Sequence, residues 1–210
     1  MGFDKNFKLY NDNGLYLEFL EPVMTKGDTL WFLKIEPYDI SNNNGFDIWT
    51  YILKKGNKTT NPGKIKDNYD ITLTLYFQKN KLVKVRLPEK VSKEIKDEFF
   101  KRLLISLAGA DINKFKRELS AILRYSNDNY IPNKSNIESI IGKPGKKSKN
   151  GKDYFFNYPY LLICKDELGS DCDPTDISID LAYSGNSHLL KIASLKLRSI
   201  KLEIDLKSTK

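Results

Sequence analysis

One segment near the middle of the chain, from Ser135 to Tyr160, constrains the fold most, because it marks both a helix and the strand that follows it. Ser135 and Glu138 have the spacing of a capping box, and the isoleucines that follow form an apolar face. Gly142 then ends the helix. A lysine-rich turn and a run of aromatic residues come next. The sequence therefore predicts a helix over 136–141 that leads into a β-hairpin.

Strand patterns occupy both ends of the chain. Apolar residues alternate with polar ones there, and β-branched and aromatic types are enriched. Clusters of glycine, asparagine and proline separate the apolar runs, which predicts an antiparallel meander in the first part. The predicted strands are 15–20, 30–35, 46–53, 69–77 and 82–87, followed by 154–158, 161–164, 177–183 and 189–206, the last with a bend near Ser199.

The apolar residues between these two regions follow a helical period. Ser92 can cap a helix whose apolar stripe runs over 95–107 and stops at Gly109. Asp111 can cap a second helix, with apolar residues facing inward over 112–123. The sequence therefore predicts two consecutive helices in the centre of the chain.

The fold class that follows is α+β. We expect an antiparallel β-sheet in the N-terminal part, helices in the centre, and a C-terminal unit of two helices followed by a four-stranded antiparallel sheet. The sequence predicts two regions, a β-rich one over 1–88 and one over 89–210 with helices followed by a four-stranded sheet. The two regions together are compatible with one compact unit.

Composition is that of a soluble globular protein. The 210 residues are 40% hydrophobic and 12% aromatic, with a mean hydropathy of −0.49, so the chain is long enough to bury a core. No apolar run approaches the roughly 18 residues of a membrane span. Charged residues are scattered through the first twenty positions, unlike a signal peptide. We expect a cytoplasmic protein or, alternatively, a periplasmic protein from which the leader has been removed.

Basic residues gather in the middle of the chain. The net charge is +8, and residues 81–150 hold 17 basic and 8 acidic side chains. Such a segment can follow a phosphate backbone, attract an acidic protein, or simply be a solvated helix face with a lysine-rich turn. We take the basic turn and the aromatic strand after it as the candidate partner-binding site, which consists of Lys143, Lys146, Lys147, Lys149, Lys152, Tyr154 and Phe156.

Nucleic acid is the alternative partner for this segment, because cations beside stacking aromatic rings hold single strands. However, strand alternation alone would place Tyr154, Phe156 and Tyr158 on one face, as any half-buried strand requires. The chain also contains no recognised RNA-binding or zinc-finger signature. A protein partner is therefore the preferred hypothesis.

Catalytic motifs are absent from the sequence. His188 is the only histidine and lies in a predicted turn, and no nucleophile motif or phosphate-binding glycine loop occurs. The acidic residues over 166–176 lack the spacing of a calcium-binding loop. We therefore expect no enzymatic activity, no cofactor and no metal.

The two cysteines, Cys164 and Cys172, leave two possibilities open. With one histidine in the chain they cannot complete an ordinary zinc site. In an oxidising compartment they could close a loop as a disulfide, and in the cytosol they would be thiols.

Residues 111–206 resemble the small modules of the SmpA/OmlA and β-lactamase-inhibitor-protein type. The likeness rests on Ile141-Gly-Lys-Pro144 before the aromatic strand from Tyr154 to Tyr158, after two predicted helices. The resemblance implies binding of other proteins through a sheet face and loops. We therefore hypothesise a bacterial immunity or inhibitor protein that neutralises a toxin or enzyme by occluding its site. The alternative is a nucleic-acid-binding accessory protein.

Overall fold

The computed structural model describes residues 7–21, 24–56, 69–113, 115–165, 170–185 and 187–209, with the backbone alone for Phe32 and Ala108. Within these residues, thirteen strands form one mixed sheet accompanied by four α-helices. The predicted α+β class is confirmed in this broad form. The sheet is larger than the predicted four-stranded C-terminal one.

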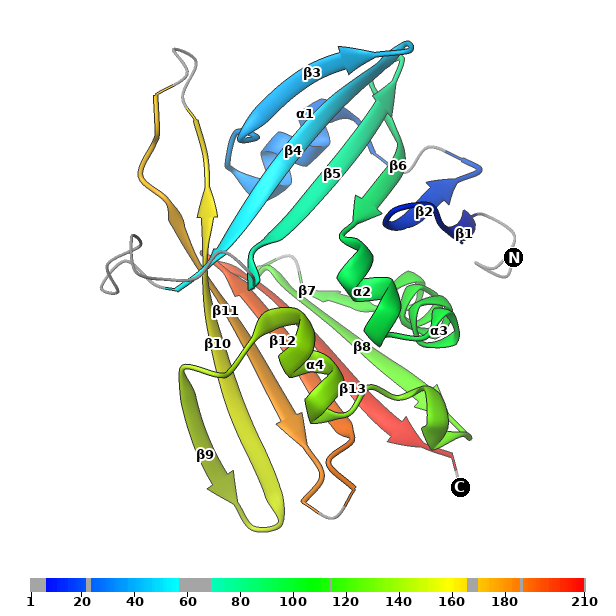
Figure 1. Cartoon of the computed structure of the whole chain (residues 1–210), viewed down its shortest axis with the longest axis vertical. Coiled ribbons are helices and arrows are strands. Elements are labelled where there is room, and N and C mark those ends of the chain that lie inside the picture. Colours follow the sequence, from blue (N-terminus) through cyan, green and yellow to red (C-terminus); the bar gives the residue numbers. More distant parts are fainter. Residues whose placement is uncertain are drawn as a thin grey trace.

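Six antiparallel strands form the N-terminal part of the sheet (Figure 1). Their order in space is β1-β2-β6-β5-β4-β3, so sequence neighbours mostly pair through short turns. Their bounds are β1 (Phe7–Asn11), β2 (Leu15–Phe19), β3 (Asp39–Asn43), β4 (Phe46–Lys55), β5 (Ile71–Gln78) and β6 (Lys81–Leu87).

Seven strands form the C-terminal part, in the order β9-β10-β11-β12-β13-β8-β7. All neighbours are antiparallel except β13 and β8, which run parallel over eight residue pairs. The bounds are β7 (Asp111–Asn113), β8 (Glu118–Tyr125), β9 (Lys146–Asn150), β10 (Asp153–Ile163), β11 (Thr175–Tyr183), β12 (Leu190–Leu197) and β13 (Ile200–Ser208).

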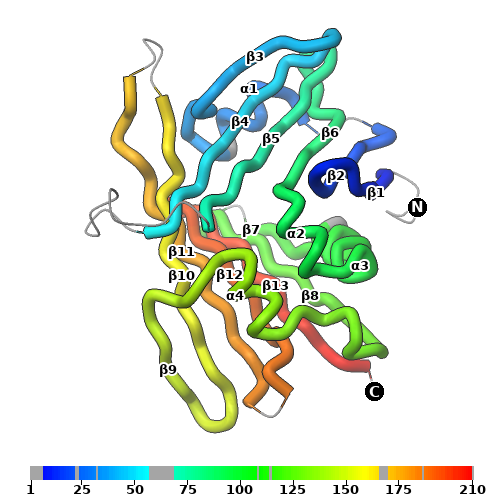
Figure 2. Tube along the Cα trace, viewed as in Figure 1, coloured from blue at the N-terminus to red at the C-terminus, as the bar shows by residue number. Residues whose placement is uncertain are grey.

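Strand β10 joins the two parts. Its residues 160–163 pair with 52–55 of β4, whereas its residues 153–157 pair with β9. The chain trace in Figure 2 shows β4 and β10 meeting at the narrow middle of the molecule. The buried apolar residues of both parts form one hydrophobic cluster. The regions 1–88 and 89–210 therefore share one sheet and one core.

Helices cover different faces of the two parts. The helix α4 (Lys134–Ile141) lies in front of the C-terminal strands in Figure 1, above the side chains of Phe156, Tyr158 and Tyr160. The helix α1 (Lys26–Leu33) lies behind β4. No described helix is long and apolar enough to cross a membrane.

The strand predicted over 30–35 is wrong, because residues 30–33 belong to α1 and Lys34 caps its end. Thr25 and Asp28 form a capping box, in which the Thr25 hydroxyl accepts from the Asp28 amide at 3.1 Å and the Asp28 carboxylate accepts from the Thr25 amide at 2.8 Å. A short apolar run fits a strand or a buried helix equally well. The capping box decides for the helix.

The single helix predicted from Ser92 to Gly109 is two helices, α2 (Glu89–Glu94) and α3 (Asp97–Ala108). Ser92 lies inside α2, and its hydroxyl donates to the Glu89 carbonyl at 2.9 Å. The backbone is extended at Ile95 and Lys96, which separates the helices.

The helix predicted from Asp111 is also wrong, because this segment forms the β7–β8 hairpin. Ala121, Leu123 and Tyr125 are buried, and Ile122 and Arg124 between them are exposed, which is the period of a strand. Pairing with β13, whose residues lie 83 positions further along the chain than their partners, stabilises β8. Such long-range pairing leaves no local sequence signal.

The short helix of the central segment exists, but its cap differs from the predicted one. Asn133 caps α4, and the capping box joins Asn133 to Asn136 rather than Ser135 to Glu138. The helix ends at Gly142 as predicted. Gly142 has a φ of +71°, and a Cβ there would lie 2.8 Å from the Tyr69 ring, so only glycine fits without strain.

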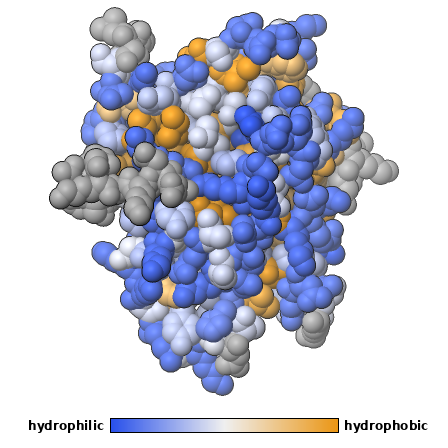
Figure 3. Space-filling view, in the orientation of Figure 1, coloured by the Kyte–Doolittle hydropathy of each residue, from blue (hydrophilic) through white to orange (hydrophobic). Residues whose placement is uncertain are grey.

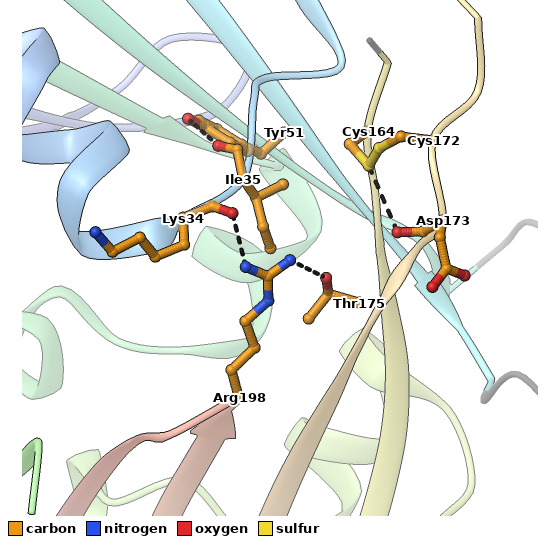
Figure 4. Close-up of a disulfide and its surroundings, with 8 residues drawn as sticks. All are labelled: Lys34, Ile35, Tyr51, Cys164, Cys172, Asp173, Thr175 and Arg198. Atoms are coloured by element: carbon orange, nitrogen blue, oxygen red, sulfur yellow. Dashed lines mark hydrogen bonds between the residues drawn. A yellow bond between two sulfur atoms is a disulfide. The ribbon is translucent and has the colours of Figure 1, made fainter.

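Polar contacts connect the N-terminal and C-terminal parts close to a disulfide of the β10–β11 connection (Figure 4). The Arg198 guanidinium, in the β12–β13 turn, donates to the Lys34 carbonyl at 2.8 Å and to the Thr175 hydroxyl at 3.2 Å. Nearby, Cys164 and Cys172 form a disulfide with their Cα atoms 5.5 Å apart. Of the two states left open by the sequence, the structure contains the bonded one.

Candidate protein-binding surface

The predicted basic turn is mostly a strand. Residues 146–150 form β9, an exposed strand that pairs with β10 on one side only. Lys143 precedes β9 and Lys152 follows it, and both are exposed. Lysines on an edge strand also prevent pairing with the edges of other chains. Lysines are therefore suited to this exposed sheet edge whether or not they bind a partner.

Strand alternation places the predicted site residues on two faces. Lys147 lies over the Phe156 ring, 6.0 Å from its centroid, and Lys149 lies over the Tyr154 ring at 5.4 Å. This is the face that carries α4. Phe156 is only 7% exposed, so its ring belongs to the core. Lys146 points to the opposite face, because it pairs with Asn157. The seven predicted residues therefore do not form one surface.

The face opposite α4 is open across five strands. Side chains at alternate positions of β10 to β13 and β8 project there, and α3 borders this face at β8. Polar and apolar side chains alternate on this face, and several of them are small. They include Phe155, Asn157, Ser178, Asp180, Ala182, Ile192, Ser194, Glu203, Asp205, Ser120 and Ile122.

Three shallow hollows lie along this open face, and all three include Glu203 of β13. The largest, about 920 Å³, reaches from Lys146 of β9 across Phe155 and Ser194. The second, about 630 Å³, lies between α3 and β8. The third, about 690 Å³, surrounds the β7–β8 hairpin. We call the three together the trough, and the third alone the hairpin hollow.

Charged groups in the trough are arranged by contacts within the protein. The Lys201 ammonium lies 2.8 Å from the Glu203 carboxylate, which raises the pKa of Lys201. The Asp180 carboxylate accepts hydrogen bonds from Asn157 at 2.6 Å and from Ser178 at 3.0 Å. Exposed pairs of this kind add little stability. Their effect is to fix the orientation of these polar side chains on the exposed sheet face.

Exposed apolar side chains concentrate beside the trough. Eight large apolar residues are exposed in the described part of the chain, and four of them belong to α3 and the β7–β8 hairpin. Phe115 is 102% exposed and Ile112 is 67% exposed, with Ile105 and Ile122 nearby in the second hollow. Clustered exposed apolar groups mark interaction sites more often than scattered ones. The view in Figure 3 shows the α4 side, where polar residues predominate on the C-terminal part.

An aromatic and basic cluster on the N-terminal strands was not predicted. Tyr10 and Tyr16 stack with centroids 5.2 Å apart, and Arg86 lies over Tyr16 at 5.6 Å. Lys84 lies 4.5 Å from the Tyr76 centroid. These residues come together only through the pairing of β1, β2, β6 and β5. Alternating Tyr and Lys positions in the separate strands were the available signal.

A buried polar cluster lies where β4 meets β10. The Lys55 ammonium lies over the rings of Tyr69, Tyr158 and Tyr160, at 5.3 to 5.9 Å from their centroids, and donates to the Ile141 carbonyl. Burial lowers the pKa of Lys55 to about 8. The tyrosine hydroxyl of Tyr160 donates to the Tyr69 carbonyl at 2.9 Å. This arrangement joins the two parts of the sheet and the end of α4.

The residues considered for catalysis or metal binding do not converge. His188 lies in the turn before β12, with its ring 6.1 Å from that of Tyr154. Among the residues that the structure describes, no group of three or more His, Cys, Asp or Glu side chains could hold a metal ion. Residues 166–169 of the acidic loop lie outside the described residues.

Comparison with known protein families, curated proteins and solved structures finds no match to this chain. The resemblance of residues 111–206 to SmpA/OmlA and β-lactamase-inhibitor-protein modules stays a prediction.

Proposed function

We propose that the protein is a non-enzymatic protein-binding protein of the immunity or inhibitor kind, which occludes a site on a toxin or enzyme by docking it in the trough. The observation that carries the proposal is the trough itself, an open sheet face with three hollows that meet at Glu203. Apolar side chains such as Phe155 and Ile192 lie beside fixed polar groups there. Mixed surfaces of this type suit protein partners, whose interfaces combine an apolar centre with a polar rim.

The basic hairpin contributes to this proposal as a rim. Lys146 lines the largest hollow and Lys143 and Lys152 are exposed at the ends of β9. Rim charges mainly raise the association rate of a partner and contribute less to the stability of the complex. The two faces of β9 therefore have different roles in the proposal. Lys147 and Lys149 cover aromatic rings, whereas Lys146 faces the bound protein.

The disulfide favours the periplasmic alternative over the cytoplasmic one, because disulfides persist mainly in oxidising compartments. We propose a periplasmic or otherwise oxidising location on this ground. Thiol labelling of the protein in its native host tests it. If Cys164 and Cys172 are both labelled without prior reduction, the proposed location is wrong.

The test of the function is affinity capture from the native host with matched surface variants. We expect wild-type protein to capture one specific protein, and Phe155→Ser and Ser194→Arg to lose it because both alter the floor of the trough. Ile40→Ser is the control, since Ile40 is also an exposed apolar strand residue but lies on β3. Capture that survives both trough variants, or that is lost equally with the control, contradicts the proposal.

Binding of single-stranded nucleic acid is the second candidate function, favoured by the stacked Tyr10 and Tyr16 beside Lys84 and Arg86. Anisotropy titrations with a fluorescent oligothymidine would detect it. We then expect Tyr16→Ala to weaken binding, and the logarithm of the association constant to fall with the logarithm of salt concentration by about 0.7 per phosphate contacted. If Lys147→Glu with Lys149→Glu weakens binding instead, β9 is the nucleic-acid site.

A further inference from the structure

The β7–β8 hairpin presents apolar side chains that the fold itself does not use. Phe115 is fully exposed at the turn, and Ile112 is two-thirds exposed on β7. Both line the hairpin hollow together with Leu119 of β8. A phenyl ring left in water gains a large apolar contribution when a partner covers it.

Hydrogen bonds connect the described residues of the hairpin to one another and to β13. The Asn113 side-chain oxygen accepts from the Lys116 amide at 3.0 Å, which shapes the turn. The Arg117 carbonyl accepts from the Lys201 amide at 3.0 Å, and the Arg117 guanidinium donates to the Ser199 hydroxyl at 3.0 Å. These contacts fasten the hairpin to the β12–β13 turn. A preordered hairpin loses little conformational entropy on binding.

The charge of the hairpin hollow is opposite to that of the whole chain. Among the residues that the structure describes, its lining includes the carboxylates of Asp111, Glu118 and Glu203 and one ammonium group, that of Lys201. Lys201 is already paired with Glu203 at 2.8 Å. Neither Asp111 nor Glu118 forms an ion pair with a lysine or arginine in the part of the chain that the structure describes. An excess of negative charge in a protein of net charge +8 favours a cationic occupant.

We propose that the hairpin hollow binds a segment of a partner protein that carries a lysine or arginine beside a large apolar side chain. This inference rests on the proposed protein-binding function and adds the chemistry of the partner. The apolar side chain contacts Phe115 and Ile112, and the cation faces Asp111 and Glu118. The carboxylates disfavour the phosphates of nucleic acid and of anionic lipid, and a flat bilayer cannot fill a hollow.

Two synthetic peptides provide the test. One has seven residues with alternating leucine and arginine, and the other has glutamate in place of every arginine. We would follow the amide signals of ¹⁵N-labelled full-length protein in 0.15 M salt during titration with each peptide. We expect saturable shifts in the β7–β8 hairpin and at residues 201–203 with the arginine peptide only. Phe115→Ser and Glu118→Lys should each weaken this binding at least about tenfold.

Trp31→Ser is the control, because Trp31 is an exposed aromatic residue on α1, far from the hairpin in sequence. It should leave the titration unchanged. Equal binding of both peptides, no shifts up to millimolar peptide, or equal loss with Trp31→Ser each overturn the inference. Binding to phosphatidylglycerol vesicles that Phe115→Ser abolishes overturns it as well, because the hairpin would then serve a membrane surface.

Failure of this inference is distinguishable from failure of the proposed function. If the captured partner is lost with Phe155→Ser but retained by Phe115→Ser and Glu118→Lys, the partner occupies the trough without using the hairpin hollow. The inference is then wrong and the proposed function stands. If the partner is retained by all of these variants, the proposed function is wrong too.

Discussion

The ammonium group of Lys55, at the end of β4, donates a hydrogen bond to the carbonyl oxygen of Ile141, the last residue of α4. The carbonyl groups at the end of a helix have no partners within the helix and carry partial negative charge. Lys55 satisfies one of them while its ammonium lies over three tyrosine rings. A single side chain thus joins the N-terminal strands, α4 and the aromatic face of β10.

Lys55 should give the stability of the protein a distinct pH dependence. Burial lowers its pKa to about 8, from 10.5 in an unperturbed lysine. Between these values the unfolded chain binds more protons than the folded one, so the free energy of unfolding rises with pH. We expect Lys55→Met to reduce this rise between about pH 7.5 and 9.5. Urea unfolding at a series of pH values measures it.

The pH window must stay below the range in which tyrosines ionise. Burial raises the pKa of Tyr158 to about 12, so ionisation of tyrosines in the unfolded chain lowers stability at higher pH. Lys84→Met is the control, because it also removes a lysine that lies over aromatic rings. If Lys55→Met and Lys84→Met show the same pH dependence as wild type, Lys55 does not titrate as we expect.

The sequence predicts elements well where the local signal decides, and poorly where a distant strand does. The end of α4 at Gly142 and the turn near Ser199 depend on local backbone requirements, and both were predicted. The β7–β8 segment is predicted as a helix because Ile112, Phe115, Leu119, Ile122 and Leu123 have helical spacing. Leu123 is buried in β8, whereas Ile112, Phe115 and Ile122 are exposed in the structure. These three side chains belong to the surface, whereas the helical interpretation placed them in a core.

The candidate site shows the same limit. Lysines and aromatic residues that adjoin in sequence from Lys146 to Phe156 separate onto two faces, because β9 and β10 are strands. The trough combines residues from seven strands, some of them far apart in sequence, such as Ser120 and Asp205, which are 85 positions apart. Only the pairing of β13 with β8 brings these two together. No local pattern could have indicated that surface.

The disulfide should stabilise the protein appreciably. It closes a short loop between Cys164 and Cys172, and the loss of loop entropy in the unfolded chain corresponds to about 2–3 kcal/mol. Cys164→Ser with Cys172→Ser should lower the free energy of unfolding by this amount, and reduction of wild-type protein should do the same. Guanidinium melts of the oxidised, reduced and double-variant proteins give the comparison. Equal midpoints for all three would show that the loop is not cross-linked in solution.

The cap of α4 can be assigned by a pair of alanine variants. Asn133→Ala removes the side chain that accepts from the Asn136 amide at 3.0 Å, and should cost about 0.5–2 kcal/mol of stability. Ser135→Ala is the matched control, because Ser135 lies in the first turn of α4 rather than at its cap. Its effect should be within a few tenths of a kcal/mol. If Ser135→Ala is the more damaging change in urea melts, Ser135 is the cap after all.

The lysines of β9 should protect the protein from self-association. β9 is exposed along its whole length, and among the described strands it pairs with β10 alone, so its outer edge presents unpaired backbone groups. Changing Lys146, Lys147 and Lys149 together to threonine keeps the strand propensity but removes the charges. We expect the triple variant to keep the wild-type circular dichroism spectrum and to form oligomers at concentrations where wild type is monodisperse. Light scattering measures this.

The control is the triple variant Lys196→Thr, Lys201→Thr and Lys207→Thr. It removes the same charge from the inner strands β12 and β13, and this variant should not associate. If both triple variants associate equally, the cause is the lower net charge of the protein, and β9 has no special protective role.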